Sequence, residues 1–272
     1  MISNQTRAIL KKWIPPIICE FIRSKKGNSF DFKGVYNSWG EALVGCGGYD
    51  SNSIFDKVLE AALMVKSGEA VYERDSVLFD EVQFSWPVTA SLMWSAAQNN
   101  GHLNVLDFGG ALGSSYFENR EFLTNLKHVT WSIVEQKHYV NGGRQFIADS
   151  RLSFYESLEE CRHLKPNVVL LSSVLQYLEK PYEILDELYR LEADLLIIDK
   201  TIINKSNTDS IYIQKVPSHI YSASYPCRSF SENQLLVHMS SSFRLLSKFE
   251  SLDFKELKQI NSKLAGYIMV KK

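Results

Sequence analysis

Short apolar runs alternate with longer amphipathic segments along the second half of the chain. The apolar runs carry no regular polar alternation, which is typical of strands that are buried on both faces. Helical patterns lie between them, beginning near Ser115 and spanning Pro181 to Leu191. The predicted strands are Leu103–Phe108, Thr130–Glu135, Leu152–Tyr155, Asn167–Ser172 and Asp194–Asp199. The pattern therefore predicts a mainly parallel sheet covered by helices on both faces.

The last part of the chain breaks this alternation. Two strand-like runs, Phe243–Ser251 and Ala265–Lys271, are separated by a polar segment and not by a long helix. Strands that follow one another without a crossover pair antiparallel. We therefore expect an antiparallel hairpin added to the parallel sheet.

The first hundred residues have a different pattern. One helix is predicted from Ser53, as N-cap, to about Lys66, and a second over Pro87–Asn99, beginning at a proline. Residues 31–50 are rich in glycine and predict loops, and residues 1–30 form a separate arm. We predict an N-terminal helical and loop extension over 1–100 that packs on or covers a Rossmann-like α/β domain over 101–272.

A glycine-rich turn follows the first predicted strand, where the chain reads Asp107-Phe108-Gly109-Gly110-Ala111-Leu112-Gly113. Glycines let a backbone turn sharply and approach a ligand closely, and open α/β sheets bind ligands at the carboxyl ends of their strands. Asp107 stands at that strand end, where a carboxylate can face a cationic group. A tight turn without a ligand is the alternative.

A second acid, Glu135, ends the next predicted strand, 22 residues beyond Gly113. An acid at this spacing is placed to accept hydrogen bonds from ribose hydroxyls, which suits both nicotinamide dinucleotides and S-adenosylmethionine. The glycines do not match the G-x-G-x-x-G dinucleotide pattern. The ammonium and sulfonium of S-adenosylmethionine give Asp107 a partner, and the terminal hairpin is similar to the reversed last strand of class I methyltransferases. These features favour a methyltransferase over a nicotinamide-dependent sugar oxidoreductase or a non-catalytic module of the same fold.

Several segments together resemble a bacterial family of class I S-adenosylmethionine-dependent methyltransferases with unassigned substrates. The resemblance covers about residues 30–270. Its segments are Tyr72–Ser76, Asp107–Phe117, Trp131–Gln136, Leu170–Leu178, Ile197–Thr201 and Ile220–Cys227. The chain departs from the family pattern at Lys200, where an arginine is expected, and at Arg228, where a tryptophan is expected.

The resemblance implies a Rossmann-like methyltransferase fold with a mainly parallel seven-stranded sheet and an antiparallel last strand. It implies a loop beside the transferring methyl, Ser172 to Tyr177, and a role in surface-polysaccharide pathways, which favours a sugar or glycan hydroxyl as methyl acceptor. With the turn and strand ends considered above, the predicted S-adenosylmethionine contacts are Asp107, Gly109, Gly110, Ala111, Gly113, Glu135, Gln136, Ser172, Ser173 and Arg74. Arg74 is expected near the cofactor carboxylate in a lid, or else in an exposed ion pair.

Transfer to a hydroxyl needs a general base. The candidates are His219, Asp199, Asp149 and Tyr177, each with a structural role as its alternative: a backbone hydrogen bond, a turn cap, an exposed loop or adenine contact, and packing. The segment 221–228 is dense in aromatic and hydroxyl groups, and we expect its loop to contact the substrate through Tyr221, Tyr225 and Arg228; an ordinary serine-rich turn is the alternative.

Composition narrows the classes of partner. The 272 residues carry 30 Lys and Arg against 31 Asp and Glu, so no basic field for nucleic acid is expected. The four cysteines and six histidines show no metal-ligand spacing, so we expect no metal and free thiols in a cytoplasmic protein. The apolar and basic segment 8–26 indicates either a packed arm or a peripheral membrane contact. A homodimer also stays open.

Overall fold

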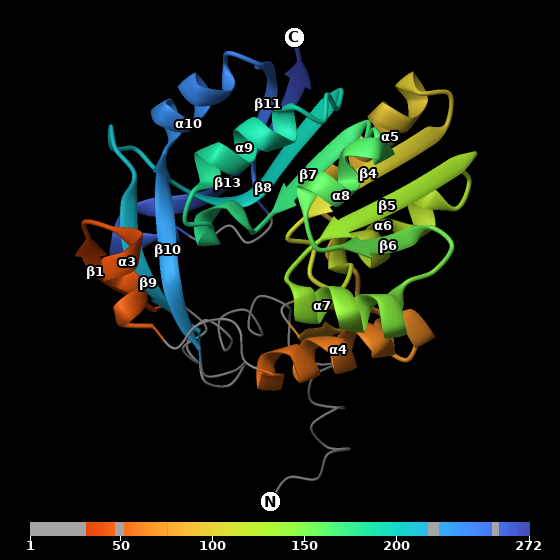
Figure 1. Ribbon diagram of the computed structural model, residues 1–272, viewed down its shortest axis with the longest axis horizontal. Coiled ribbons are helices and arrows are strands. Elements are labelled where there is room, and N and C mark those ends of the chain that lie inside the picture. The colour runs from red at the N-terminus through yellow and green to blue at the C-terminus, as the bar shows by residue number, and fades with distance from the viewer. Residues whose placement is uncertain (1–30, 47–51, 75, 217–222, 252–255) are drawn as a thin grey trace, which may run out of the picture.

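The structure is a computed structural model that describes residues 31–46, 52–74, 76–216, 223–251 and 256–272 (Figure 1). The N-terminal arm, with the predicted membrane contact over 8–26, lies outside the described residues. So do two predicted site residues, His219 and Tyr221.

The centre of the fold is a sheet whose strands do not follow chain order. Five strands run parallel, in the order β6 (Leu152–Tyr155), β5 (His128–Val134), β4 (His102–Phe108), β7 (Val168–Ser172) and β8 (Leu195–Asn204). Next to β8 lies β13 (Ser262–Lys271), antiparallel to it, followed by β11 (Phe243–Glu250). The mixed α/β fold, with a mainly parallel sheet and a reversed last strand, is therefore as predicted.

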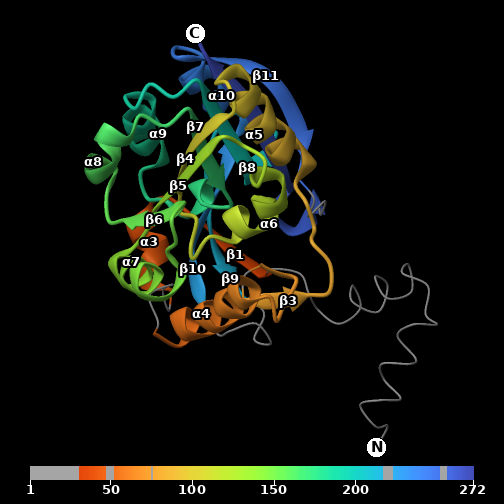
Figure 2. The same ribbon diagram turned by 90° about the vertical axis from the view of Figure 1, so that its right-hand side faces the viewer.

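Helices cover both faces of the sheet, as Figure 2 shows with α8 and α9 on one side and α5 and α6 on the other. The helices are α3 (Trp39–Val44), α4 (Asn52–Ser67), α5 (Trp86–Gln98), α6 (Ser114–Leu123), α7 (Lys137–Gly142), α8 (Leu158–Cys161), α9 (Pro181–Tyr189) and α10 (Glu232–Met239). Shorter turns are the π-helix η1 (Gly143–Ile147) and the 3-10 helices η2 (Arg162–Leu164), η3 (Leu175–Tyr177) and η4 (Lys258–Ile260).

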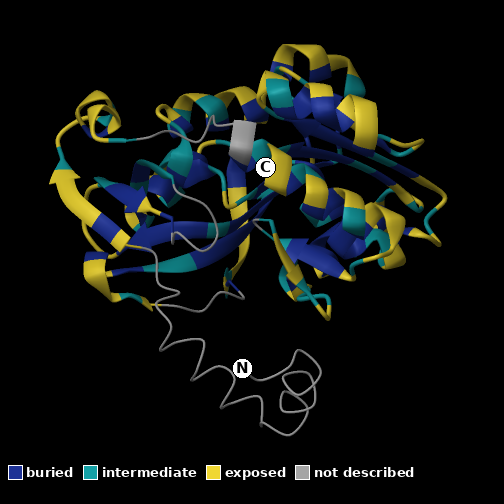
Figure 3. Ribbon diagram, turned by 90° about the horizontal axis from the view of Figure 1, so that it is seen from below, coloured by how far each residue is buried: buried dark blue, intermediate teal, exposed yellow. Residues whose placement is uncertain are grey.

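Alternate residues of the strands enter two separate apolar cores, since successive side chains of a strand point to opposite faces. On β4, Val105 belongs to the core under α4 to α7, and Leu106 belongs to the core under α8, α9 and α10. Figure 3 shows the central strands buried and the outer surfaces of the helices exposed. Burial on both faces explains why the strand sequences are continuously apolar.

An added antiparallel extension continues the sheet beyond β8. The strand β10 (Ser224–Ser231) pairs in parallel with the end of β8 and antiparallel with β9 (Ser210–Lys215), and β9 pairs with β1 (Asp31–Tyr36). With β12 (Glu256–Leu257), the sheet has eleven strands among the described residues, and a separate hairpin joins β2 (Tyr72–Arg74) to β3 (Val77–Phe79).

Three predictions from the sequence are wrong in this extension and near it. The loop-rich region 31–50 contains β1 and α3, and the predicted loop 221–228 is largely the strand β10. The helix α4 begins at Asn52, so Ser53 is not its N-cap. The helix α5 begins at Trp86, one residue before the predicted start, and has Pro87 in its first turn.

No helix in these described ranges is long and apolar enough to cross a membrane. Likewise, in the part of the chain that the structure describes, no group of His, Cys, Asp and Glu side chains is arranged to hold a metal ion. The described cysteines, Cys46, Cys161 and Cys227, are free thiols.

Candidate functional site

A large cavity of about 1560 Å³ lies at the carboxyl ends of β4, β5 and β7. Its first wall is the turn after β4 with the ends of β5 and β7. Its second wall comes from β2, β3, β8, β9, β10 and η3, with Phe32 of β1 and with Trp39 and Leu43 of α3. This volume exceeds that of an ordinary small-molecule site, so there is room for two ligands side by side.

The turn after β4 depends on two glycines at contacts where a side chain does not fit. A Cβ at Gly110 would lie 2.6 Å from the carboxylate of Asp107. At Gly109 it would lie 2.3 Å from Val174 Cγ2, and Gly109 has a φ of +74°. The turn therefore packs directly against Asp107 on one side and the β7 loop on the other, as the predicted close approach requires.

Ala111 also lies in the left-handed region, with a φ of 48°. This conformation costs a residue with a Cβ roughly 1–2 kcal/mol relative to its right-handed form. The turn therefore holds a strained backbone at a residue that lines the cavity. Gly113, which also was predicted to contact the cofactor, has a φ of +97°, is the N-cap of α6 and does not line the cavity.

Asp107 is a buried carboxylate with one occupied oxygen. Its side chain accepts a hydrogen bond from Trp131 Nε1 at 3.0 Å through Oδ2, while Oδ1 has no hydrogen-bond partner among the described residues. Burial raises the pKa of Asp107 to about 7; the Trp131 hydrogen bond opposes this rise, and the charge of Glu135 adds to it. A buried, half-satisfied carboxylate on a cavity wall is poised for a cationic ligand group.

Glu135 follows β5 directly and lies beside the same turn. Its Oε2 accepts a hydrogen bond from Gln136 N at 2.6 Å, and its carboxylate also accepts from the backbone of Ala111. Burial raises the pKa of Glu135, and these backbone hydrogen bonds oppose the rise. Asp107 and Glu135 thus share one wall of the cavity, as the sequence predicted.

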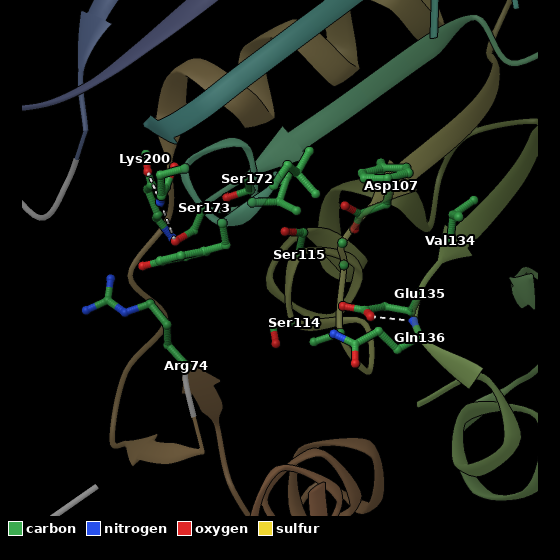
Figure 4. Close-up of a pocket in the computed structure, with 18 of the residues that line it drawn as sticks. Arg74, Asp107, Ser114, Ser115, Val134, Glu135, Gln136, Ser172, Ser173 and Lys200 are labelled. Atoms are coloured by element: carbon green, nitrogen blue, oxygen red, sulfur yellow. Dashed lines mark hydrogen bonds between the residues drawn. The ribbon is translucent and has the colours of Figure 1, made fainter. Parts of the chain in front are cut away.

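The other predicted cofactor residues lie around the same cavity. Gln136, Ser172 and Ser173 line it from the ends of β5 and β7. Arg74 lines it from β2, with its guanidinium 5.4 Å from the ring centre of Phe79. Figure 4 shows Arg74 and Lys200 on one side and Asp107 and Glu135 on the other.

The β2–β3 hairpin is attached to the glycine turn through a neighbour of Arg74. Glu73 is buried and accepts a hydrogen bond from Ser114 Oγ at the first residue of α6. Its other oxygen accepts from Ser76 N at 3.3 Å. This contact fixes the strand that carries Arg74 against the turn that carries Gly109 and Gly110.

Two of the four predicted general bases lie outside the cavity lining. Asp149 accepts hydrogen bonds from the backbone of Arg151 and Leu152, at 2.7 and 2.8 Å, where the chain enters β6 at its amino end. Asp199 is buried and accepts from Lys200 N at 2.8 Å and Ser251 Oγ at 2.9 Å. Both carboxylates hold backbone in place, which for Asp199 resembles the turn-capping alternative that the sequence left open; for Asp149 the alternatives were an exposed loop or an adenine contact.

Tyr177 does line the cavity, and its hydroxyl donates a hydrogen bond to Gln214 Oε1 at 3.2 Å. Of the predicted substrate contacts, Tyr225 lines the cavity, with its ring edge-on to that of Tyr177 at 5.0 Å between centres. Arg228 does not. Its guanidinium is held by Asp209 and the carbonyl of Glu179, so it lies behind the wall and not in the site.

Three polar lining residues were missed by the sequence analysis as site residues, Glu118, Lys200 and Gln214, whereas Gln176 lies in the loop Ser172 to Tyr177 that the family resemblance implied beside the methyl. The two glutamines are buried, and among the described residues Gln176 Oε1 and Gln214 Nε2 have no hydrogen-bond partner. Only Glu118 had a local signal, since it stands four residues after Ser114 on the helix that follows the turn. The others reach the cavity through long-range packing.

No family model matches the chain, and no curated protein matches it. One similar solved structure is the N-terminal domain of EvdMO1, with SAH and D-fucose; it is 13% identical, with a TM-score of 0.48, and covers 78% of this chain and 95% of its own. A second is the 1,6-didemethyltoxoflavin-N1-methyltransferase of Burkholderia thailandensis, at 14% identity and a TM-score of 0.40; the match covers 83% of this chain and 92% of that enzyme. A third is the [4+2]-cyclase SpnF, which is 12% identical with a TM-score of 0.48; the match covers 80% of this chain and 94% of SpnF.

Proposed function

We propose that the chain is an S-adenosylmethionine-dependent methyltransferase that binds its cofactor at the wall formed by the glycine turn. The observation that carries the proposal is Oδ1 of buried Asp107, which has no hydrogen-bond partner among the described residues and lies under Gly110 and beside Glu135. A ligand that offers a cation to Asp107 and hydroxyls to Glu135 satisfies both carboxylates. S-adenosylmethionine has both groups.

Each residue then has a separate task. Asp107 accepts a hydrogen bond from the cofactor ammonium, Glu135 accepts hydrogen bonds from the ribose hydroxyls, and Arg74 pairs with the cofactor carboxylate. When bound, S-adenosylmethionine supplies an activated methyl group. The remaining work of the protein is to align the acceptor and to exclude water, which the enclosing β2–β3 hairpin and the added strands support.

For the acceptor, we propose the hydroxyl of a sugar, a glycan or another small molecule. The second wall combines aromatic rings, Tyr177 and Tyr225, with two buried amides, Gln176 and Gln214, each of which has one atom without a hydrogen-bond partner among the described residues. Aromatic faces pack on sugar rings, and a hydroxyl both donates to a carbonyl and accepts from an amide N–H. The polysaccharide-pathway role and the cytoplasmic location rest on the sequence alone and stay predictions.

A dinucleotide fits the same wall less well. The pyrophosphate of a nicotinamide cofactor is anionic, and at the turn it would lie beside the buried carboxylate of Asp107, where like charges repel. The turn also lacks the G-x-G-x-x-G spacing. This disfavours the oxidoreductase alternative.

The test is isothermal titration of the purified protein with S-adenosylhomocysteine and, separately, with NAD. We expect saturable heat with the first and none with the second. Mass spectrometry of the protein as purified checks for bound cofactor or its demethylated product. Binding of NAD without binding of S-adenosylhomocysteine would overturn the proposal, and binding of neither would favour a non-catalytic module.

A further inference from the structure

Glu118 presents a carboxylate oxygen to the cavity from the same helix that begins at the glycine turn. It lies one turn after Ser114 on α6, about 6 Å farther along the helix axis, and both residues line the cavity. The residue is only 6% exposed. Its Oε1 accepts a hydrogen bond from Ser85 N at 2.7 Å, while Oε2 has no hydrogen-bond partner among the described residues. One oxygen therefore anchors the side chain and leaves the other for a ligand.

Lys200 faces Glu118 because β8 has a bulge at this point. Asp199 and Lys200 together oppose the single residue Gly266 on β13, and Lys200 has a φ of 51°. Bulges redirect side chains and are frequent next to active sites. Lys200 lines the cavity, and within the described ranges its ammonium has no ion pair within 4.0 Å.

The strand order gives the position of this pair relative to the cofactor. Glu135 and Ser172 lie two residues beyond the level of Asp107 on the strands at either side of β4, because Asp107 is level with Ile133 and Leu170. On β8, Asp199 is level with Ser172, and Lys200 is the next residue. Neighbouring strands are about 4.8 Å apart. With the ribose at Glu135 and the ammonium at Asp107, the next positions, over β7 and β8, belong to the acceptor.

We propose that Glu118 is the general base of the transfer, with Oε2 accepting the proton of the acceptor hydroxyl and Lys200 holding Glu118 in its charged form. This inference rests on the proposed function. The acceptor oxygen forms a bond to the methyl carbon as the bond from that carbon to sulfur breaks. The hydroxyl proton moves to Glu118, and the products are the methyl ether and S-adenosylhomocysteine. Glu118 then returns the proton to solvent through the cavity.

The charges around Glu118 come from two elements. Lys200 and Asp199 face it from β8, and Arg74 faces it from β2. Burial raises the pKa of Glu118, Asp199 adds to the rise, and the hydrogen bond from Ser85 and the charges of Lys200 and Arg74 lower it. A carboxylate with a raised pKa is a stronger base, and the two cations keep it ionised until a proton arrives.

The test uses two cofactor analogues and needs no acceptor. Sinefungin carries an ammonium group in place of the transferable methyl, whereas S-adenosylhomocysteine carries nothing there. If Glu118 lies opposite the methyl, its carboxylate pairs with that ammonium. We expect the wild-type protein to bind sinefungin at least about tenfold more tightly than S-adenosylhomocysteine by titration calorimetry, as a charge-assisted hydrogen bond predicts.

The matched variant is Glu118→Gln, which keeps the hydrogen bond to Ser85 N and removes the charge. We expect it to abolish the preference for sinefungin while S-adenosylhomocysteine affinity stays within about twofold. Thr89→Val is the control for packing, because it removes the neighbouring hydrogen bond between α5 and α6, from Thr89 Oγ1 to Asn119 Oδ1 at 2.7 Å, away from the cavity. It should retain the preference.

In Lys200→Met, the preference should be lost at a higher pH than in wild type, because removal of the cation raises the pKa of Glu118. If Glu118→Gln lowered the affinity for both analogues equally, the inference would be overturned, because Glu118 would then contact the amino-acid part of the cofactor. Unchanged affinity of Glu118→Gln for both analogues would also overturn the inference. Failure of wild type to bind both analogues would instead reject the proposed function.

Discussion

The two walls of the cavity are built in different ways. The proposed cofactor wall consists of three short segments, 107–115, 134–136 and 172–174, at the ends of three adjacent parallel strands. The proposed acceptor wall draws single residues from distant parts of the chain, among them Phe32, Trp39, Glu118, Tyr177, Lys200, Gln214, Tyr225 and Leu264. The first wall is made by backbone turns, and the second by side chains that the added strands bring together.

Because of this difference, the two walls should differ in the amino-acid substitutions that they tolerate. A turn whose glycines touch Asp107 and Val174 has no space for a changed residue. The proposed acceptor wall is a set of side chains from several strands, helices and turns, and we expect a substitution there to change a contact without changing the backbone. We therefore expect mutations in the cofactor wall to affect binding of the cofactor and stability together, and mutations in the acceptor wall to spare both.

The largest effect is expected for Gly109→Ala. The new Cβ would meet Val174 Cγ2 at 2.3 Å, at a φ of +74°. Overpacking and the left-handed backbone together should cost about 3 kcal/mol of unfolding free energy and abolish S-adenosylhomocysteine binding. Denaturant unfolding and titration calorimetry measure the two losses. The double variant Gly109→Ala/Val174→Ala should regain part of the stability. If it does not, the loss of stability does not come from a steric clash with Val174.

Loss of either carboxylate of the cofactor wall comes next. Asp107→Ala and Glu135→Ala should each weaken S-adenosylhomocysteine binding by roughly 1–3 kcal/mol, the range for lost charge-assisted hydrogen bonds. Tyr225→Ala, on the acceptor wall, should leave that affinity within about twofold. Near-wild-type binding in both carboxylate variants, with the fold intact by circular dichroism, contradicts the comparison between the walls.

The pH dependence of cofactor binding sharpens the comparison further. Because the pKa of Asp107 is raised to about 7, the free protein must release a proton to pair with the cofactor ammonium below that pH. The affinity for S-adenosylhomocysteine should level off about one unit above pH 7 and fall below pH 7 by up to about tenfold per pH unit. Asp107→Asn should flatten this profile; a wild-type profile that is flat from pH 5 to 8 would exclude the role of Asp107.

The same shift has the opposite sign for stability. The folded state of the free protein binds the Asp107 proton more tightly than the unfolded state, whose pKa is near the ordinary 3.8. The contribution of Asp107 to stability is therefore fully present below about pH 4 and is lost as the pH rises towards 7. Cofactor binding and free-state stability thus respond to pH in opposite directions at this one carboxyl group.

The smallest effect is expected for Ala111→Gly. Glycine relieves the left-handed conformation at a φ of 48° but loses more entropy on folding, so the net gain in stability should be about 0.5–1 kcal/mol. The melting temperature, measured with and without S-adenosylhomocysteine, checks this. A decrease in stability would mean that the methyl group of Ala111 makes contacts that outweigh its backbone strain.

The parallel strands and the glycine turn could be read from local patterns for a physical reason. Strands buried on both faces must be apolar throughout, so β4 and β7 stand out in the sequence. Asp107 and Glu135 end two such strands, and strands that lie parallel bring their carboxyl ends to one edge of the sheet. The sequence alone therefore placed both carboxylates in one site and predicted the reversed final strand from its missing crossover helix.

Only the tertiary structure decided the acceptor wall. The strand β1 forms because it pairs with β9, far along the chain, so its own glycine-containing sequence predicted a loop. The bulge that turns Lys200 into the cavity depends on pairing with Gly266, and the hydrogen bonds that keep Asp149 and Asp199 out of the cavity lining come from neighbouring backbone and from Ser251. Local patterns report what a segment must bury; which side chains then meet across a cavity depends on partners that no local pattern names.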